Sequence, residues 1–295
     1  MDDFRLKVFI TAARTLSFTR TAEQLCISQP AVSKHVGELE SRYEVQLFTR
    51  RGSRLELTEA GHTLLESAER LADDYRRLEY EMSLCTGQTE GELRLGASTT
   101  IAQYLLPPIL ARFTGRFPQV RVSVLSGNSG QIEQALGDHA IDLGLVESVS
   151  RRQGLHYTLF RPDELVLITR SGGRFARMES VLPEELCRIP LVLRESGSGT
   201  LEVISAALAE RGIRLSQLHV VLRLGSTEGI KRFVRHSDAM AIVSAFSVVD
   251  ELRSGALRIV DLEGLALLRD FVFVHSEAHP ARLVRQFMDF ALSGC

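Results

Sequence analysis

The most regular pattern near the start of the chain lies between Ser17 and Glu40, where apolar residues recur at helical spacing. Two short helices could bury one shared face through Ala22, Leu25, Ile27, Ala31, Val32, Val36 and Leu39. Ser28 is a favourable N-cap for the second helix, and Pro30 falls in its first turn, where a missing N–H is tolerated. The pattern therefore predicts two helices joined by a tight turn, the helix-turn-helix arrangement.

The polar face of the second predicted helix carries residue types that recognise DNA. Gln29 can pair with adenine, Lys34 with guanine or phosphate, and Ser33 with either, while His35 lies on the same side. The second helix of such a motif lies in the major groove with its N-terminal residues on base edges. We therefore expect these four residues to contact DNA. An ordinary helical hairpin with a solvated outer face would share this short pattern.

A small β-hairpin is predicted next. Residues 47–57 alternate between apolar and polar on both sides of Gly52-Ser53. Arg50, Arg51 and Arg54 cluster at its tip. Arginines on a hairpin beside a recognition helix can reach phosphates or the neighbouring minor groove, so we expect these three to clamp the DNA backbone. A charged turn exposed to water is the alternative.

A long helix follows the hairpin, with Thr58 as its cap and Glu59 at the positive end of its dipole. Its apolar residues are spaced alternately four and three apart, at Leu64, Ala68, Leu71, Tyr75, Leu78, Met82 and Cys85. This spacing is a heptad seam. We infer that a second copy of the chain packs against it, giving a homodimer or homotetramer; packing on the chain's own body is the alternative.

The pattern changes after a polar hinge with two glycines, residues 86–91. Strands are expected over 92–97, 120–125 and 141–146, with helices over 99–113 and 129–136. A second unit has strands over 164–169, 191–193, 219–224 and 240–243, helices over 200–211 and 226–234, then strands over 257–262 and 271–275 and a helix near 280–292. Alternating strands and helices predict parallel sheets covered by helices. Two such lobes enclose a cleft, and ligands bind at the carboxyl ends of the strands.

Hydroxyl-bearing residues gather where these strands give way to helices. A helix N-terminus lined with hydroxyls attracts anions, so several of them facing one cleft suggest a small carboxylate or inorganic oxyanion as the ligand. The candidate residues are Ser98, Thr99, Thr100, Asn128, Ser196, Ser198, Thr200 and Thr227. Plain helix capping is the alternative for each of them. Glu147, at the end of a strand, is expected as a hydrogen-bond partner in the pocket.

Composition limits the possible classes of protein. The 295 residues suffice for two or three domains, and the net charge of −2 means that DNA affinity must come from a local patch. Four cysteines, at Cys26, Cys85, Cys187 and Cys295, lie far apart without a CxxC pair, which suits a reducing cytoplasm without disulfides or a zinc site. No apolar run reaches the length of a membrane span, and the acidic start does not match a signal peptide. We expect a cytoplasmic protein that does not contact membranes and holds no metal or cofactor.

Two groups of motifs give the chain a resemblance to LysR-type transcriptional regulators. The first group is Ser17-Phe-Thr-Arg-Thr-Ala-Glu-Gln-Leu25, Ile27-Ser-Gln-Pro-Ala-Val-Ser33, Leu47-Phe-Thr-Arg-Arg51 and Leu57-Thr-Glu-Ala-Gly61. The second group is Leu93-Arg-Leu-Gly-Ala-Ser-Thr-Thr-Ile101, Ile141-Asp-Leu-Gly-Leu-Val-Glu147, Arg194-Glu-Ser-Gly-Ser-Gly-Thr200 and Gly225-Ser-Thr-Glu228. Together these motifs span nearly the whole chain.

The resemblance implies an α+β multidomain fold. A winged helix-turn-helix DNA-binding domain would cover residues 1–58, a dimerising linker helix and hinge 59–91, and a two-lobed α/β effector domain 92–295, similar to periplasmic binding proteins. Lobe I would comprise 92–161 and 267–292, and lobe II 162–266. The resemblance also implies an effector pocket that contains Ser98, Thr100, Asn128, Ser198, Thr200 and Thr227.

The sequence gives no support for an enzyme. It holds no Gly-x-Ser-x-Gly elbow, no Walker loop and no GxGxxG after a strand. We expect a regulator that binds promoter DNA under the control of a small, anionic effector. The alternative is a cytosolic solute-binding protein whose N-terminal helices only dimerise it.

Overall fold

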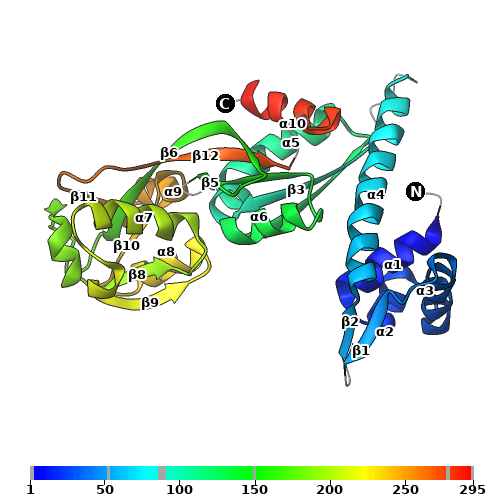
Figure 1. Ribbon diagram of the computed structural model, residues 1–295. Helices are drawn as coiled ribbons and strands as arrows, with labels where there is room; N and C mark the ends of the chain where they lie inside the picture. Colours follow the sequence, from blue (N-terminus) through cyan, green and yellow to red (C-terminus); the bar gives the residue numbers. More distant parts are fainter. Residues whose placement is uncertain (1–2, 52–53, 86–90, 149–150, 277–279, 294–295) are drawn as a thin grey trace. The chain divides into compact units, whose positions relative to one another are not determined.

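The computed structural model describes residues 3–51, 54–85, 91–148, 151–276 and 280–293. The chain divides into two compact units, Met1–Gly91 and Glu92–Cys295. Figure 1 labels the helices and strands of both units.

Three helices begin the first unit, and the second and third are the pair predicted above. They are α1 (Phe4–Thr15), α2 (Phe18–Leu25) and α3 (Gln29–Tyr43). Ser28 caps α3 by accepting a hydrogen bond from the backbone N–H of Ala31 at 3.3 Å. Val8, Ala22 and Val32 are buried together and hold the three helices against one another. The predicted helix-turn-helix is therefore confirmed as α2 and α3.

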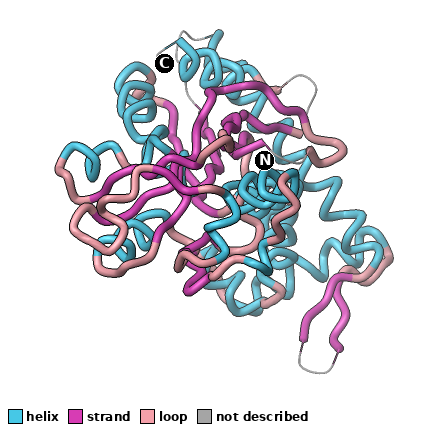
Figure 2. The backbone as a smooth tube through the Cα atoms, turned by 90° about the vertical axis from the view of Figure 1, so that its left-hand side faces the viewer, coloured by secondary structure: helices cyan, strands magenta, loops and turns pink. Residues whose placement is uncertain are grey.

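The predicted hairpin is also confirmed. Its antiparallel strands are β1 (Phe48–Arg51) and β2 (Arg54–Leu57). Phe48 anchors the hairpin to the helices, because its ring packs edge-on against Phe9 and Phe18 at centroid distances of 5.7 and 5.4 Å. Figure 2 shows the hairpin projecting beyond the helices to which it is joined.

The long helix α4 (Glu59–Cys85) starts where the sequence predicted. Its cap is Thr58, whose Oγ1 accepts the N–H of Gly61 at 3.0 Å. A Cβ atom at Gly61 would lie only 2.2 Å from the backbone oxygen of Leu47. Glycine therefore lets the first turn of α4 approach the backbone beside the hairpin.

The apolar seam of α4 divides into two parts. Leu64 and Ala68 pack into the core of their own unit, and Arg14 on α1 pairs with Glu69 at 2.8 Å. The expectation that the whole seam is left for a second copy is therefore wrong for the first turns, because α1 already covers them. Further along, three seam residues are more than half exposed: Leu71, Leu78 and Met82. The side chain of Cys85 lies outside the described residues.

The described part of the second unit contains one ten-stranded sheet. Neighbouring strands follow the order β4 (Val120–Gly127), β3 (Gly91–Ser98), β5 (Leu143–Ser148), β12 (Leu267–His275), β6 (His156–Arg170), β10 (Met240–Ser244), β8 (Leu191–Arg194) and β9 (Val220–Leu224). Of the two further strands, β11 (Leu257–Leu262) pairs with β6, and β7 (Ser180–Val181) pairs with β11. Parallel pairing is present between β3 and β5 and among β8, β9 and β10, as the strand–helix alternation predicted.

Two long antiparallel strands join the lobes. Figure 1 shows β6 and β12 side by side along the sheet, and their register runs from His156 opposite His275 to Leu165 opposite Leu267. One end of β12 pairs with β5, while the far end of β6 pairs with β10 and β11. The sheet is therefore continuous from one lobe to the other.

Helices cover the sheet in both lobes. In lobe I they are η1 (Ile101–Leu105, a π-helical turn), α5 (Leu106–Arg116), α6 (Ser129–Gly137) and α10 (Arg282–Ser293). In lobe II they are η2 (Pro183–Cys187), α7 (Gly199–Glu210), η3 (Leu215–Gln217), α8 (Thr227–Arg235), η4 (Ala245–Ser247) and α9 (Val249–Arg253). Phe113 of α5 and Phe287 of α10 pack edge-on at 5.1 Å. Figure 1 shows these two helices on the opposite side of the sheet from α6.

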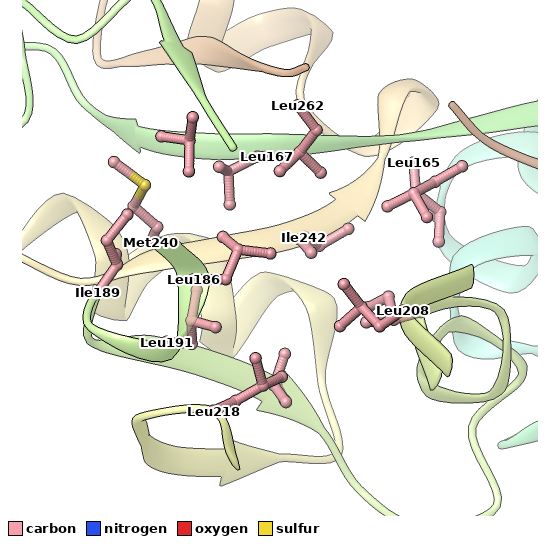
Figure 3. Close-up of a cluster of buried hydrophobic side chains, with 14 of the residues drawn as sticks. Leu165, Leu167, Leu186, Ile189, Leu191, Leu208, Leu218, Met240, Ile242 and Leu262 are labelled. Atoms are coloured by element: carbon pink, nitrogen blue, oxygen red, sulfur yellow. The ribbon is translucent and has the colours of Figure 1, made fainter. Parts of the chain in front are cut away.

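Lobe II has a hydrophobic core on each face of its sheet. Leu167 and Ile242 face α7, in the cluster that Figure 3 shows, together with Leu208. Their chain neighbours, Ile168 and Ala241, face α8 instead. Successive strand residues point to opposite faces, so a continuous apolar run is what a strand covered on both sides requires.

Candidate DNA-binding surface and effector site

The outer face of α3 presents three of the predicted DNA-contacting side chains to solvent. Gln29, Ser33 and Lys34 are exposed, whereas Val32 and Val36 on the inner face are buried. The Nε2 of Gln29 donates a hydrogen bond to the Oγ of Ser33 at 3.0 Å, so the two side chains share one side of the helix. The first turns of α3 therefore offer an amide, a hydroxyl and an ammonium group on one surface.

His35 lies in a different environment from these three residues. Its ring packs edge-on against Phe4 at 5.4 Å, and its Nδ1 lies 3.8 Å from the carboxylate of Glu38. The side chain is about one quarter exposed. His35 thus helps to hold α1 against α3.

The three predicted hairpin arginines are exposed. Arg50 and Arg51 lie on β1 and Arg54 on β2, with Arg51 directly opposite Arg54. The tip between them, residues 52–53, lies outside the described residues. A groove of about 560 Å³ separates α3 from the hairpin, and its lining includes Ser33 and Arg50. Candidate DNA-contacting residues therefore lie on both sides of one groove.

The candidate effector site begins where β3 and β5 end side by side. Ser98 ends β3, and its Oγ donates a hydrogen bond to Oε1 of Glu147 on β5 at 3.0 Å. Ser129, in the first turn of α6, donates to Oε2 of the same carboxylate at 2.5 Å. Glu147 is buried, with 5% of its surface exposed. Glu147 therefore accepts hydrogen bonds from two side chains, while its predicted place in an effector pocket stays a prediction.

A buried arginine connects this carboxylate to lobe II. The Nη1 of Arg269 on β12 donates to Oγ1 of Thr200 at 2.9 Å and lies 3.5 Å from Oε1 of Glu147. Its Nε pairs with Asp163 on β6 at 2.6 Å, and Asp163 also accepts a hydrogen bond from Ser244. Burial raises the pKa of the Asp163 carboxyl above its usual range, although Arg269 and Ser244 lower it. The Nη2 of Arg269 is buried without a hydrogen-bond partner.

A second arginine brings two more candidates together. The Nη1 of Arg194, at the end of β8, donates to Oγ1 of Thr227 at 3.4 Å, and its other nitrogens pair with Glu195. The side chain of Asn128 from lobe I helps to lower the pKa of the Glu195 carboxyl. Burial tends to raise the pKa of Glu195, but the bonds and charge of Arg194 outweigh it, so this pKa lies below its usual range.

The predicted effector residues differ in their surroundings. Five of them are buried within the second unit: Ser98, Thr100, Ser198, Thr200 and Thr227. Thr99 is half-buried, and its Oγ1 is enclosed without a hydrogen-bond partner. Ser196 is exposed and lines, with Asn128, a shallow pocket of about 520 Å³. The arrangement thus gathers most candidates in the interior and leaves Ser196 at the surface.

Capping explains some of these residues but not all. Asn128 accepts the N–H of Gln131 at 2.9 Å and so caps α6, and Ser226 caps α8 in the same way. Ser198 stands at the N-cap position of α7 but makes no capping bond with its side chain. The Oγ of Ser98 accepts the N–H of Ile101 at 3.5 Å, as a cap would, and also donates to Glu147 at 3.0 Å.

Sequence reasoning missed Asp163, Arg194 and Arg269. Each is a charged residue beside or within an apolar strand run, and each is buried in the structure. A charge is seldom buried unless it is paired, so a charged residue in or beside a predicted buried strand indicates a buried polar site.

A separate polar cluster also bridges the lobes. Lys231 of α8 pairs with Glu228 at 2.7 Å and Glu251 at 2.9 Å, and its Nζ lies 5.0 Å from the ring centre of Tyr104 on η1. The Tyr104 hydroxyl donates to Glu228. Burial, followed by the Glu228 hydrogen bond and charge, raises the pKa of Tyr104.

Comparison with known proteins agrees with this anatomy. Residues 4–62 match the model of the bacterial regulatory helix-turn-helix proteins of the lysR family, and residues 86–295 match that of the LysR substrate binding domain. The chain is 31% identical over 287 residues to the Escherichia coli (strain K12) HTH-type transcriptional regulator YeiE, covering 97% of this chain and 95% of YeiE.

Solved structures show the same fold. Full-length CbnR complexed with its target DNA matches with a TM-score of 0.67 at 20% identity, covering all of both chains. The regulatory domain of CcmR from Synechocystis PCC6803, in complex with 2-PG, matches with a TM-score of 0.62 at 24% identity, covering 69% of this chain and 96% of that one.

The motif, the two-lobed unit and these matches define a DNA-binding transcription regulator with an effector-binding domain. The chain belongs to the LysR family. Among the described residues, no helix is long and apolar enough to cross a membrane, and no group of three acidic, histidine or cysteine side chains is placed to hold a metal ion.

Proposed function

We propose that this regulator binds promoter DNA as a homodimer or homotetramer and that a small anionic effector, bound between the lobes of residues 92–295, modulates that binding. The proposed division is 1–58 for DNA binding, 59–91 for linkage and dimerisation, and two lobes of 92–161 with 267–292 and of 162–266. Because such a regulator acts on the chromosome, we place it in the cytoplasm.

The exposed face of α3 supports the proposed DNA contacts. Gln29, Ser33 and Lys34 stand clear of the core and supply the donors and acceptors that read base edges in the major groove. Arg50 across the groove, with Arg51 and Arg54, offers charge for the phosphates. His35 can join them only through the part of its ring that Phe4 leaves open.

One observation carries the effector proposal: two hydroxyls of lobe I and a buried guanidinium, itself bonded to a hydroxyl of lobe II, gather around a single carboxylate. Ser98 and Ser129 approach it from lobe I, and Arg269 links it to Thr200 of lobe II. Groups that hold one carboxylate out of water can hold another. The CcmR regulatory domain in complex with 2-PG supports a small-molecule ligand for a domain of this fold.

Salt-dependent promoter binding tests the DNA half of this proposal. The full chain should bind a fragment of its own promoter more tightly than an unrelated fragment of equal length. Affinity should fall steeply between low and high salt, because phosphate contacts release counterions. Equal, weak binding to both fragments at every salt concentration would favour a solute-binding protein that merely dimerises through its N-terminal helices.

A further inference from the structure

The hydroxyl of Ser98, predicted to bind an effector, already donates to a carboxylate of the same chain, as does the neighbouring hydroxyl of Ser129. Both oxygens of Glu147 accept hydrogen bonds, one from Ser98 and one from Ser129. Arg269 lies 3.5 Å from the first of these oxygens. Glu147 is therefore held in the way that a bound acid would be held.

Two helix N-termini meet at this carboxylate. Ser129 lies in the first turn of α6, and Gly199 in the first turn of α7. A Cβ atom at Gly199 would lie 2.7 Å from Cβ of Glu147 and 2.9 Å from Oγ of Ser129. The absence of a side chain thus lets lobe II close directly over the carboxylate. The positive ends of both helix dipoles favour a negative charge at this place.

The local balance of charge singles out Glu147. Asp163 makes the shorter contact with Arg269, at 2.6 Å against 3.5 Å for Glu147. Arg269 is 6% exposed and is shared between the two carboxylates, while its Nη2 remains buried without a partner. The site therefore holds two carboxylates, Glu147 and Asp163, against the single guanidinium of Arg269. The Nη2 of that guanidinium is a donor without an acceptor.

We propose that Glu147 is a built-in ligand of this interlobe anion site, which the acid group of an effector must displace. The proposal rests on the anionic effector of the proposed function. Glu147 then acts as a specificity determinant: a simple anion cannot replace a tethered carboxylate, whereas an effector with further contacts can. The apparent affinity for any acid is its affinity for the vacated site multiplied by the fraction of molecules in which Glu147 has left that site.

Chemical rescue of a truncated side chain tests this role. Glu147→Ala removes a fragment of the size of acetate but leaves the hydroxyls and Arg269 in place. The purified full-length variant should show a melting temperature that rises with added sodium acetate, because a ligand that binds only the folded state stabilises it. Acetamide, which has the same shape without the charge, and sodium chloride at equal concentration should have no such effect.

Glu133→Ala provides the matched control. Glu133 is also a buried glutamate of lobe I and accepts a hydrogen bond from Tyr157, but it contacts neither Ser98 nor Arg269 in any described interaction. Neither this variant nor the wild type should respond to acetate. A response of Glu147→Ala to acetamide equal to its response to acetate, or the same acetate response in both variants, would overturn the proposal.

Glu147→Gln covers the case in which the alanine variant does not fold. It keeps the shape of the side chain and removes its charge, so inorganic sulfate should bind it about tenfold more tightly than the wild type in a calorimetric titration. Equal sulfate affinities would overturn the built-in ligand but leave the proposed regulator intact. Promoter binding by Glu147→Gln that responds to neither sulfate nor acetate, although the built-in carboxylate has been removed from the site, would contradict the anionic effector as well.

Discussion

Single buried side chains decide what the interior between the lobes can bind. Arg269 donates to Asp163 and Thr200, and Glu147 accepts from Ser98 and Ser129, so six side chains from different segments are fixed by polar contacts. An uncompensated charge at this depth costs several kcal/mol. Substituting one member therefore disturbs all of them.

On the DNA-binding surface, the single residues Ser33 and Lys34 can be tested by substitution. Ser33→Ala and Lys34→Ala should each weaken operator binding about tenfold or more, because a contact to a base is worth roughly 1–3 kcal/mol. Ser41→Ala is the matched control, since Ser41 is an exposed serine at the other end of α3. Gel-shift titration with folding checked by circular dichroism measures the effect. Operator affinities of Ser33→Ala and Ser41→Ala that are equal to wild type would exclude the first turns of α3 as the reading surface.

At the scale of elements, α4 changes its environment along its length. Its first turns complete the core of the first unit through Leu64 and Ala68, while Leu71 and Leu78 are more than half exposed. Apolar side chains repeated in heptad positions rarely remain in water. We therefore expect the second part of the helix to form the contact between copies.

Charge substitution in the exposed seam tests this contact. Leu71→Lys combined with Leu78→Lys should convert the protein to monomers in sedimentation velocity, because two lysines would face their counterparts in an apolar seam. The fold of each copy should survive, since surface substitutions usually change stability by about 0.5 kcal/mol or less. Leu182→Lys, at a comparably exposed leucine, should leave assembly unchanged. Assembly of the double variant identical to wild type would place the interface elsewhere.

Short and long elements differed in how far the sequence predicted them. Apolar runs located β8 and β10 and the helices that cover them, because a strand buried on both faces needs apolar residues throughout. The strands β6 and β12 are longer than predicted, since Asp163 and Arg269 interrupt their apolar runs. Those two charges are buried only because they pair with each other across the sheet, and a partner distant in sequence leaves no local pattern.

The candidate site was predicted in the same uneven way. Strand-end turns led to Ser98, Thr200 and Thr227, because hydroxyls before helices are a local signal. The arginines that connect them, Arg194 and Arg269, gave no periodic signal. The local pattern thus predicts the hydroxyls of the site, whereas the charged residues between them are brought together only by the tertiary fold.

At the scale of the whole second unit, the lobes are held together at separate points. Tyr104 of lobe I donates to Glu228 and lies beneath Lys231 of lobe II, apart from the contacts of Glu147. Each of these contacts joins a side chain of lobe I to one of lobe II, so separation of the lobes would break it. Effector binding and lobe closure should therefore be energetically coupled.

Tyr104→Phe should loosen this closure while keeping the ring in place. Loss of a half-buried hydrogen bond to a carboxylate should lower the free energy of unfolding by about 1 kcal/mol. Amide hydrogen exchange should rise at residues 129–131 and 199–201, where the lobes meet. Tyr157→Phe removes a comparable hydrogen bond to Glu133 within lobe I and should leave exchange at those segments unchanged. Unchanged exchange in the Tyr104 variant would show that this contact does not govern closure.

The paired course of β6 and β12 constrains how such a domain can diversify. The proposed lobe I consists of two stretches of chain, 92–161 and 267–292, and lobe II is the stretch between them, so exchanging either lobe for that of a relative needs two junctions at once. Pro162 and Asp270 face each other on the same rung of the ladder. A chimaera joined at these two positions would keep paired segments of β6 and β12 from the same parent on either side of the junctions. A single junction between them would instead pair a β6 from one parent with a β12 from the other.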